Sequence, residues 1–281
     1  MSLANDGEFS FQQRKPGVFG LGANIGKSSA VGADFINAVS LGLIPGLSMW
    51  IGEGHNGDID TAAAEDVWDV GGLMQYLTAA ETVNIASTSS EDASGNTGAY
   101  TVKVEYLDSA LDLQDETITL DGVNNVQLAE NAIRVLRLTA LTGGSNEANV
   151  GIITATADTS GYVMCEILAG QGLSHQAHFT VPNGYTALVM GVLFQTHKAA
   201  GGGKPVVNFL GKIRPFGGLW LEVFESYIDT DNQNFLFLNQ SEVGAPLIQA
   251  KTDLRIECST DVNDTEVTCR FWVLLRKPVQ A

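Results

Sequence analysis

Short segments in which apolar and polar residues alternate recur from about residue 79 onward, and they constrain the fold more than any other feature. Residues 100–106 read YTVKVEY, so aromatic and Val side chains alternate with Thr, Lys and Glu. A period of two places these two sets on opposite faces of a β-strand. Residues 117–120 repeat the pattern and end at Asp121-Gly122, a turn dipeptide. The pattern predicts half-buried strands.

Similar segments fill the rest of the chain, and helical periodicity is weak, with residues 131–138 as its one plausible example. Asn183-Gly184 supplies the positive φ values of a tight hairpin between two of the segments. Many short strands at near-regular spacing predict an all-β fold, an antiparallel β-sandwich or jelly-roll-like body. The further strand candidates are 82–87, 133–141, 150–157, 163–168, 175–181, 187–195, 206–213, 219–228, 234–238, 254–259 and 266–277.

The first part of the chain has a different texture. Residues 1–65 are rich in Gly, Ala, Ser and Asn and show neither the period of a helix nor that of a strand. They include the apolar run AVSLGLIPGLSMWI at 38–51, which a monomer would hardly leave exposed. The sequence therefore predicts an extended N-terminal arm, 1–65, that docks on a neighbouring chain. The β-sandwich body is then 66–281, with 66–170 and 171–281 as an alternative division into two subdomains.

The charge balance excludes some partners. The chain has 15 Lys and Arg against 32 Asp and Glu, a net charge of −17. Binding to nucleic acid or to anionic lipid needs clustered cations, so neither partner is expected. The start of the chain has no basic segment followed by an apolar run, and the run at 38–51 is too short for a bilayer span. We expect the chain to be made and kept in the cytoplasm, or in something assembled there.

The last two strand candidates can be paired from the sequence. A hairpin turn at Asn263-Asp264 sets Cys258 opposite Cys269, Ile256 opposite Phe271, Glu257 opposite Arg270 and Arg255 opposite Trp272. The chain has three Cys and no CxxC pair, which predicts reduced, buried thiols. The face predicted to be buried holds Leu254, Ile256, Cys258, Val267, Cys269, Phe271, Val273 and Leu275. Trp272 lies on the other face, so we expect that face to be covered as well.

No motif predicts a catalytic, cofactor-binding or metal site. The stretch GLGANIGKS at 20–28 lacks the spacing of a nucleotide-binding loop. The acidic groups at 58–69 and 229–233 lack the Gly and the bidentate Glu of a calcium loop. His175 and His178 would lie on opposite faces of a strand, and His55 and His197 have no partner at ligand spacing. Trp50, Trp68, Trp220 and Trp272 are dispersed, which favours core packing over a glycan platform.

Several short segments between residues 65 and 195 carry a further signal: EDVWD at 65–69, GG at 71–72, TAAETVNI at 78–85, NTGAYTV at 96–102, EYLD at 105–108, ETITLDG at 116–122, IRV at 133–135, NVG at 149–151 and VPNG at 181–184. With these segments, the region 65–195 resembles virion structural proteins of tailed bacteriophages, marine ones in particular, of the β-rich head-decoration or tail-associated type. The resemblance implies a structural role without catalytic residues.

Together these features predict a non-enzymatic subunit of a tailed-phage virion, a homotrimeric capsid decoration (cement) protein. Its partners would be further copies of itself and the major capsid protein or tail components. The alternative is a tail- or fibre-associated adaptor or a carbohydrate- or receptor-binding protein. A hydrolase on a β scaffold ranks third, because a pair of catalytic carboxylates converges only in space. A major shell protein is disfavoured, since the sequence has no long helical pattern.

Overall fold

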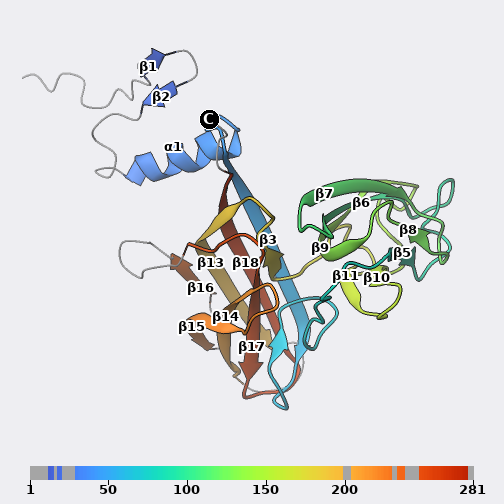
Figure 1. The fold of residues 1–281 in the computed structure, drawn as a ribbon. Coiled ribbons are helices and arrows are strands. Elements are labelled where there is room, and N and C mark those ends of the chain that lie inside the picture. Colours follow the sequence, from blue (N-terminus) through green and yellow to red (C-terminus); the bar gives the residue numbers. More distant parts are fainter. Residues whose placement is uncertain are drawn as a thin grey trace, which may run out of the picture.

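The computed structural model describes residues 12–15, 18–20, 29–198, 204–229, 233–237 and 247–277. Most of the described elements are antiparallel strands, together with one helix, α1 (Ser29–Ser40) (Figure 1). A short hairpin of β1 (Gln12–Lys15) and β2 (Val18–Gly20) precedes the helix. Residues 21–28 of the Gly-Lys-Ser stretch and 230–232 of the second acidic group lie outside the described residues.

Eight strands form a sandwich of two four-stranded sheets. One sheet has the order β16-β13-β18-β3, and the other β12-β17-β14-β15, with β4 (Glu65–Asp66) also paired to β17. Taken in chain order as first to eighth, the strands give sheets 1-8-3-6 and 2-7-4-5, the order of a jelly roll. The predicted all-β class is confirmed. The eight strands are β3 (Leu47–Ile59), β12 (His178–Thr180), β13 (Thr186–Lys198), β14 (Val206–Pro215), β15 (Leu221–Asp229), β16 (Gln233–Phe237), β17 (Thr252–Thr260) and β18 (Thr265–Arg276).

A second β unit is inserted between the first and second strands of the jelly roll. Its sheets have the orders β11-β10-β5-β8 and β7-β6-β9, and it lies beside β3 (Figure 1). We call residues 83–167 the inserted module. The jelly roll is therefore discontinuous in sequence, and the alternative division near residue 170 matches only the end of the module. The module strands are β5 (Val83–Ser87), β6 (Ala99–Asp108), β7 (Leu113–Thr119), β8 (Val126–Gln127), β9 (Ala132–Gly143), β10 (Ile153–Ala157) and β11 (Val163–Ile167).

The prediction of an extended arm over residues 1–65 is wrong for β3, because this strand belongs to the jelly roll. The whole of β3 pairs with β18, for example Trp50 with Val273. The period of two is hidden because the inward residues Gly52 and Gly54 are small. A Cβ on Gly52 would lie 2.2 Å from the Phe271 ring, so glycine makes room for an aromatic core residue. Residues 29–40 are also helical and not extended, and α1 lies at the end of the jelly roll where β3 begins (Figure 1).

The predicted C-terminal hairpin is wrong, although its buried face is confirmed. β17 and β18 lie in different sheets, so Cys258 pairs with Phe209 and Cys269 with Phe194. The loop at 261–264 crosses from one sheet to the other, as a jelly-roll connection does. All eight residues of the predicted inward face are buried. The Asn183-Gly184 turn behaves in the same way: Gly184 has φ +74°, but the turn links β12 and β13 of different sheets.

Aromatic side chains fill the space between the two sheets. Phe179, Phe194, Phe209 and Phe271 are fully buried, and the rings of Phe194 and Phe209 stack with centroids 4.5 Å apart. The three cysteines are free and buried. Burial raises the pKa of the Cys165 thiol to about 12, which keeps it in the unreactive thiol form.

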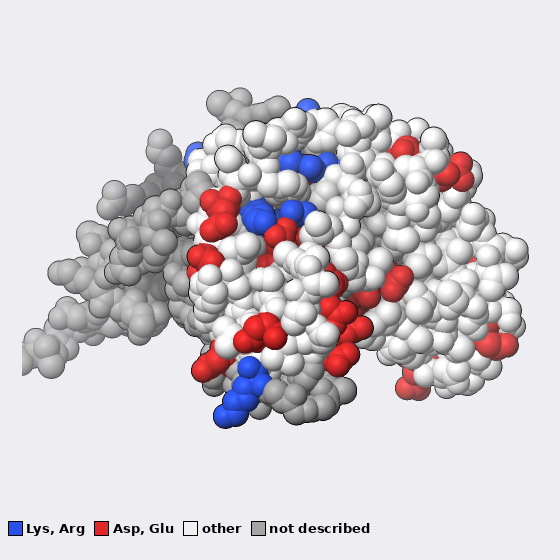
Figure 2. All heavy atoms as spheres, turned by 90° about the horizontal axis from the view of Figure 1, so that it is seen from below, with Lys and Arg blue, Asp and Glu red and all other residues white. Residues whose placement is uncertain are grey.

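The surface carries the acidic excess. Asp and Glu are spread over the face seen from below, whereas Lys and Arg gather in a few groups (Figure 2). A helix long and apolar enough to span a bilayer is not found in the described part of the chain.

Candidate functional site

Two linkers join the inserted module to the jelly roll, and they run side by side in opposite directions. The amide of Ala177 donates to the carbonyl of Val67 at 2.8 Å, and the amide of Asp69 donates to the carbonyl of His175 at 3.1 Å. Asp69 on the incoming linker thus meets His175 on the outgoing linker, 106 residues later. This pairing brings chemistry-bearing side chains from distant parts of the sequence to one place.

Asp69 lies between two histidines. One of its oxygens is 2.7 Å from Nδ1 of His55 on β3, and the other is 3.3 Å from Nδ1 of His175. The Asp69 side chain is only 1% exposed, and Nε2 of His55 lies 3.4 Å from Glu266 on β18. The two imidazole rings meet edge to face with centroids 6.4 Å apart. We call these residues the His–Asp–His cluster.

The charges in this cluster stabilise each other. The hydrogen bond to Asp69 raises the pKa of His55 against the opposing effect of burial, and the carboxylate of Glu266 adds to the rise. Burial alone would raise the pKa of Asp69, but hydrogen bonds from His175 and His55 outweigh it and hold that pKa below its usual value. The sequence analysis gave His55 no partner, since its contacts depend on the two linkers. His178 lies elsewhere, with Nε2 at 3.2 Å from Asp66.

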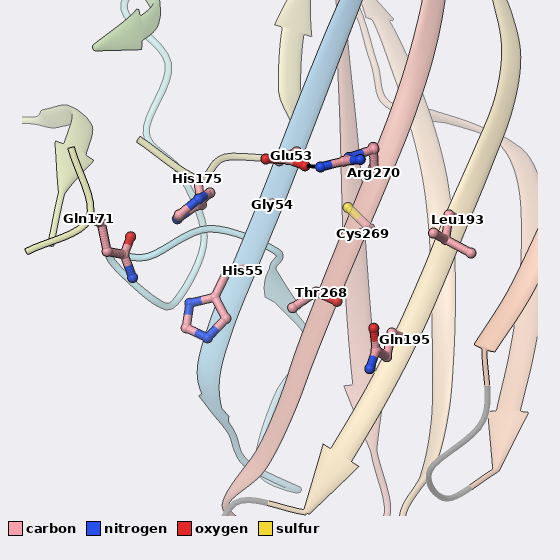
Figure 3. A pocket seen from close by; sticks show the side chains of 10 residues that line it. All are labelled: Glu53, Gly54, His55, Gln171, His175, Leu193, Gln195, Thr268, Cys269 and Arg270. Atoms are coloured by element: carbon pink, nitrogen blue, oxygen red, sulfur yellow. Dashed lines mark ion pairs between the residues drawn. The ribbon is translucent and has the colours of Figure 1, made fainter. Parts of the chain in front are cut away.

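Two hollows lie beside this cluster on the outer face of β13, β18 and β3. The first, about 330 Å³, is lined by Glu53, Gly54, His55, Gln171, His175, Leu193, Gln195, Thr268, Cys269 and Arg270 (Figure 3). The second, about 290 Å³, is lined by Ile51, Glu53, Arg137, Leu173, Ser174, Arg270 and Trp272. Glu53 and Arg270 line both hollows, and the ion pair between these two side chains joins β3 to β18. We call the two hollows together the groove.

The surroundings of Cys269 and His55 restrain the chemistry of these two groove side chains. Cys269 is only 3% exposed, and burial raises its thiol pKa, so it is not a nucleophile at neutral pH. Nδ1 of His55 contacts Asp69 and Nε2 lies 3.4 Å from Glu266, so both ring nitrogens face carboxylates. The first hollow also contains the hydrogen-bonding side chains of Gln171, Gln195 and Thr268. Trp272 is half-buried and lines the second hollow together with Arg137 of the inserted module, whose guanidinium carbon lies 4.0 Å from the ring centroid of Trp50.

A separate ionic network fixes the inserted module to the jelly roll. Arg134 of β9 makes two hydrogen bonds to Asp253 of β17, at 2.9 and 3.0 Å. Arg214 and Thr180 also donate to Asp253, each at 2.7 Å. Burial would raise the pKa of Asp253, but the charge of Arg134 and the hydrogen bonds from Arg134, Arg214 and Thr180 together outweigh it and lower that pKa. The predicted Glu257–Arg270 pair is wrong: Glu257 accepts from Lys212 and Arg255, and Arg270 pairs with Glu53.

The acidic residues singled out in the sequence separate in space. Asp66 is fully buried and lies 3.5 Å from Arg255. Glu65 accepts hydrogen bonds from Asn56 and Gly72. Asp58 and Asp60 are exposed and group with Asp264, with one oxygen of each within 4.8 Å of the others. Exposed carboxylates of this kind are solvated, and by themselves they do not define a metal site.

The tryptophans are mainly structural. Trp50 and Trp68 are buried at 8% and 3% exposure. Trp220 is half-buried and stacks with Arg214 and Arg255, whose guanidinium carbons lie 4.5 and 4.3 Å from its ring centroid. The predicted core role therefore holds for Trp50 and Trp68, whereas Trp272 lines the groove.

No protein-family model and no curated protein sequence matches this chain. Among solved structures, the Gx strain structure of infectious bursal disease virus matches 84% of this chain and 73% of its own, with 10% identity and a TM-score of 0.22. The VP2 subviral particle of that virus matches 88% and 83%, with 11% identity and a TM-score of 0.19. Similarity at this level shows neither a common family nor a common function.

Proposed function

We propose that this chain is a non-enzymatic structural subunit of a viral particle. The observation that carries the proposal is the jelly-roll strand order, 1-8-3-6 and 2-7-4-5, of the eight-stranded body. Jelly rolls of this type build viral capsid and lectin domains. The core of a jelly roll is formed by its two sheets, so a connection between strands can carry an insertion. Here the connection between the first and second strands carries the whole inserted module.

The finer proposal is a homotrimeric decoration protein on the head of a tailed bacteriophage, with further copies of itself and the major capsid protein as partners. Two features support it. The region 65–195 resembles virion proteins of these phages. The segment after α1 is apolar and open, with Leu41 73% and Leu43 52% exposed. Apolar side chains left open in this way are typical of surfaces that another chain covers.

The second candidate, a tail- or fibre-associated adaptor or receptor-binding protein, is favoured by the groove, which offers polar and apolar side chains on rigid strands. Position on the particle separates the two candidates. An antibody raised against the recombinant chain, bound to purified particles and imaged by electron microscopy, should label the head surface. Labelling confined to the tail would favour the second candidate, and particles without label would contradict a virion role.

A further inference from the structure

The groove on the outer face of β13, β18 and β3 combines features that define the class of its ligand. We propose that it binds a neutral oligosaccharide of at least two sugar rings. This inference concerns a ligand of the isolated protein and goes beyond the role in a particle. The argument rests on the pairing of charges, the kinds of side chain and the shape of the groove.

The charged side chains of the groove already have partners of opposite sign. Glu53 pairs with Arg270, and Arg137 lies 3.6 Å from Glu105. His55 and His175 share the buried Asp69. A charged ligand would have to break one of these pairs, whereas a neutral ligand can hydrogen-bond to the outer atoms of intact pairs.

The polar groups suit vicinal hydroxyls. Gln171, Gln195 and Thr268 line the first hollow with both donors and acceptors, next to the planar groups of Glu53 and Arg270. Planar amide, carboxylate and guanidinium groups can hydrogen-bond two adjacent hydroxyls at once. In Figure 3, Gln171 and His175 lie on one side of the β3–β18 pair and Gln195 lies on the other, so a ligand over that pair reaches both.

The second hollow supplies an apolar surface. Trp272, Ile51 and Leu173 line it, and Ile51 is 46% exposed. Aromatic and aliphatic side chains of this kind pack against the C–H face of a sugar ring, which is apolar although its edge is polar. The hollows of about 330 and 290 Å³ meet at Glu53 and Arg270, so adjacent rings of one oligosaccharide can occupy both.

Other ligand classes fit less well. A peptide strand would need a free sheet edge, but Arg137 donates to the carbonyl of Ile51 and occupies the edge of β3 beside the second hollow. A nucleic acid would need unpaired cations. The groove also lies where the inserted module meets the jelly roll, and ligand sites occur preferentially at such domain interfaces.

Saturation-transfer NMR and calorimetry on the full chain test the proposal, with cellotetraose, maltotetraose, laminaritetraose, mannotetraose and chitotetraose as probes. At least one probe should bind, and Arg270→Ala should weaken it by about tenfold or more, the loss expected for a hydrogen bond to a charged group. Arg276→Ala is the matched control, because Arg276 is exposed on the same strand and lies outside the groove. Circular dichroism should show both variants folded.

Three outcomes would overturn the proposal. The first is that none of the five probes binds. The second is that Arg276→Ala weakens binding as much as Arg270→Ala. The third is that the protein self-associates through the groove, so that Arg270→Ala breaks the oligomer while the sugars have no effect. Labelling of particles does not enter this test, so failure of the ligand proposal is distinct from failure of the particle role.

Discussion

At the scale of single residues, Asp69 shows how a buried carboxylate stays charged. Its two oxygens face imidazoles from two different segments, and these contacts outweigh the effect of burial on its pKa. The pKa of His55 is raised by the same contact. A histidine with a raised pKa stabilises the fold fully below its unfolded value, about 6.5, and that contribution disappears as pH rises through the folded value.

His55→Gln should therefore destabilise the protein more at about pH 5.5 than at about pH 9. Asp69 has a lowered pKa, so its own contribution is present above about pH 4 and is lost as the pH falls through its folded value. Urea unfolding at both pH values measures the difference. Asp69→Asn should abolish this dependence on pH. If His55→Gln lowers the free energy of unfolding equally at both pH values, the role given to the His55–Asp69 contact is contradicted.

Phe271→Ala should cost ~3–5 kcal/mol in the free energy of unfolding, because the fully buried ring leaves a cavity that Gly52 cannot fill. Leu141→Ala, at a side chain that is 51% exposed, serves as the control and should change stability by ~0.5 kcal/mol or less. Chemical denaturation gives both values. A loss in Phe271→Ala as small as in the control would place that ring outside the core.

Residue patterns predicted the buried faces well where the inward side chains are large. The alternation at 254–275 identified eight buried residues of β17 and β18 but missed the buried Thr252 and Thr265, whose side chains are polar. It failed for β3, where Gly52, Gly54 and Asn56 alternate inward and give no apolar signal. The His–Asp–His cluster could not be predicted, because His55, Asp69 and His175 meet only through the pairing of two linkers.

At the scale of elements, the sequence predicted which segments are strands but not which strands pair. Each predicted strand overlaps an observed strand, and residues 132–138 of the possible helix at 131–138 belong to β9. Both predicted hairpins instead cross between sheets. A short turn such as Asn183-Gly184 fixes a local change in direction, whereas the partner of each strand depends on the whole jelly roll.

The contact between the inserted module and the jelly roll gives a prediction at this scale. Arg134→Met should cost ~3–5 kcal/mol, since it leaves the buried Asp253 without its bidentate partner. Lys103→Met is the control. Lys103 lies in the same module and makes surface pairs, 3.6 Å from Glu105 and 3.5 Å from Asp115, so its loss should cost less than ~1 kcal/mol.

Urea unfolding measures both variants, and limited proteolysis of the linkers shows whether the module loosens. Faster cleavage near residues 70–80 is expected in Arg134→Met alone. Equal stability of the two variants would mean that Arg134 does not hold the module.

At the scale of the whole molecule, the N-terminal segment separates into two parts with different roles. β3 completes a sheet, and its loss would uncover the edge of β18 and remove Trp50 from the core. In the segment before β3, Leu41 and Leu43 are exposed at the end of the jelly roll. A chain without residues 1–60 should therefore fail to fold, whereas a chain that begins at Gly46 should keep its fold.

Thermal unfolding and solubility compare the two truncated chains. Gly46 is the natural start because its carbonyl accepts a hydrogen bond from Lys277 at 2.8 Å. A soluble, cooperatively folded chain without residues 1–60 would show that β3 is dispensable.

The acidic excess also acts at this scale. With a net charge of −17, copies of the chain repel each other at long range, and a basic partner surface would attract them. Binding to particles should weaken as salt concentration rises, which a co-sedimentation series at increasing salt would show. Binding that does not change with salt would leave apolar contacts as the main source of affinity.

Sedimentation velocity tests the central claim, assembly of a structural subunit through its N-terminal segment, most directly. We predict that the full chain sediments as a trimer of the 29.8 kDa subunit and that the folded chain beginning at Gly46 sediments as a monomer. A full chain that remains monomeric at all concentrations, or a truncated chain that forms the same oligomer, would contradict the claim.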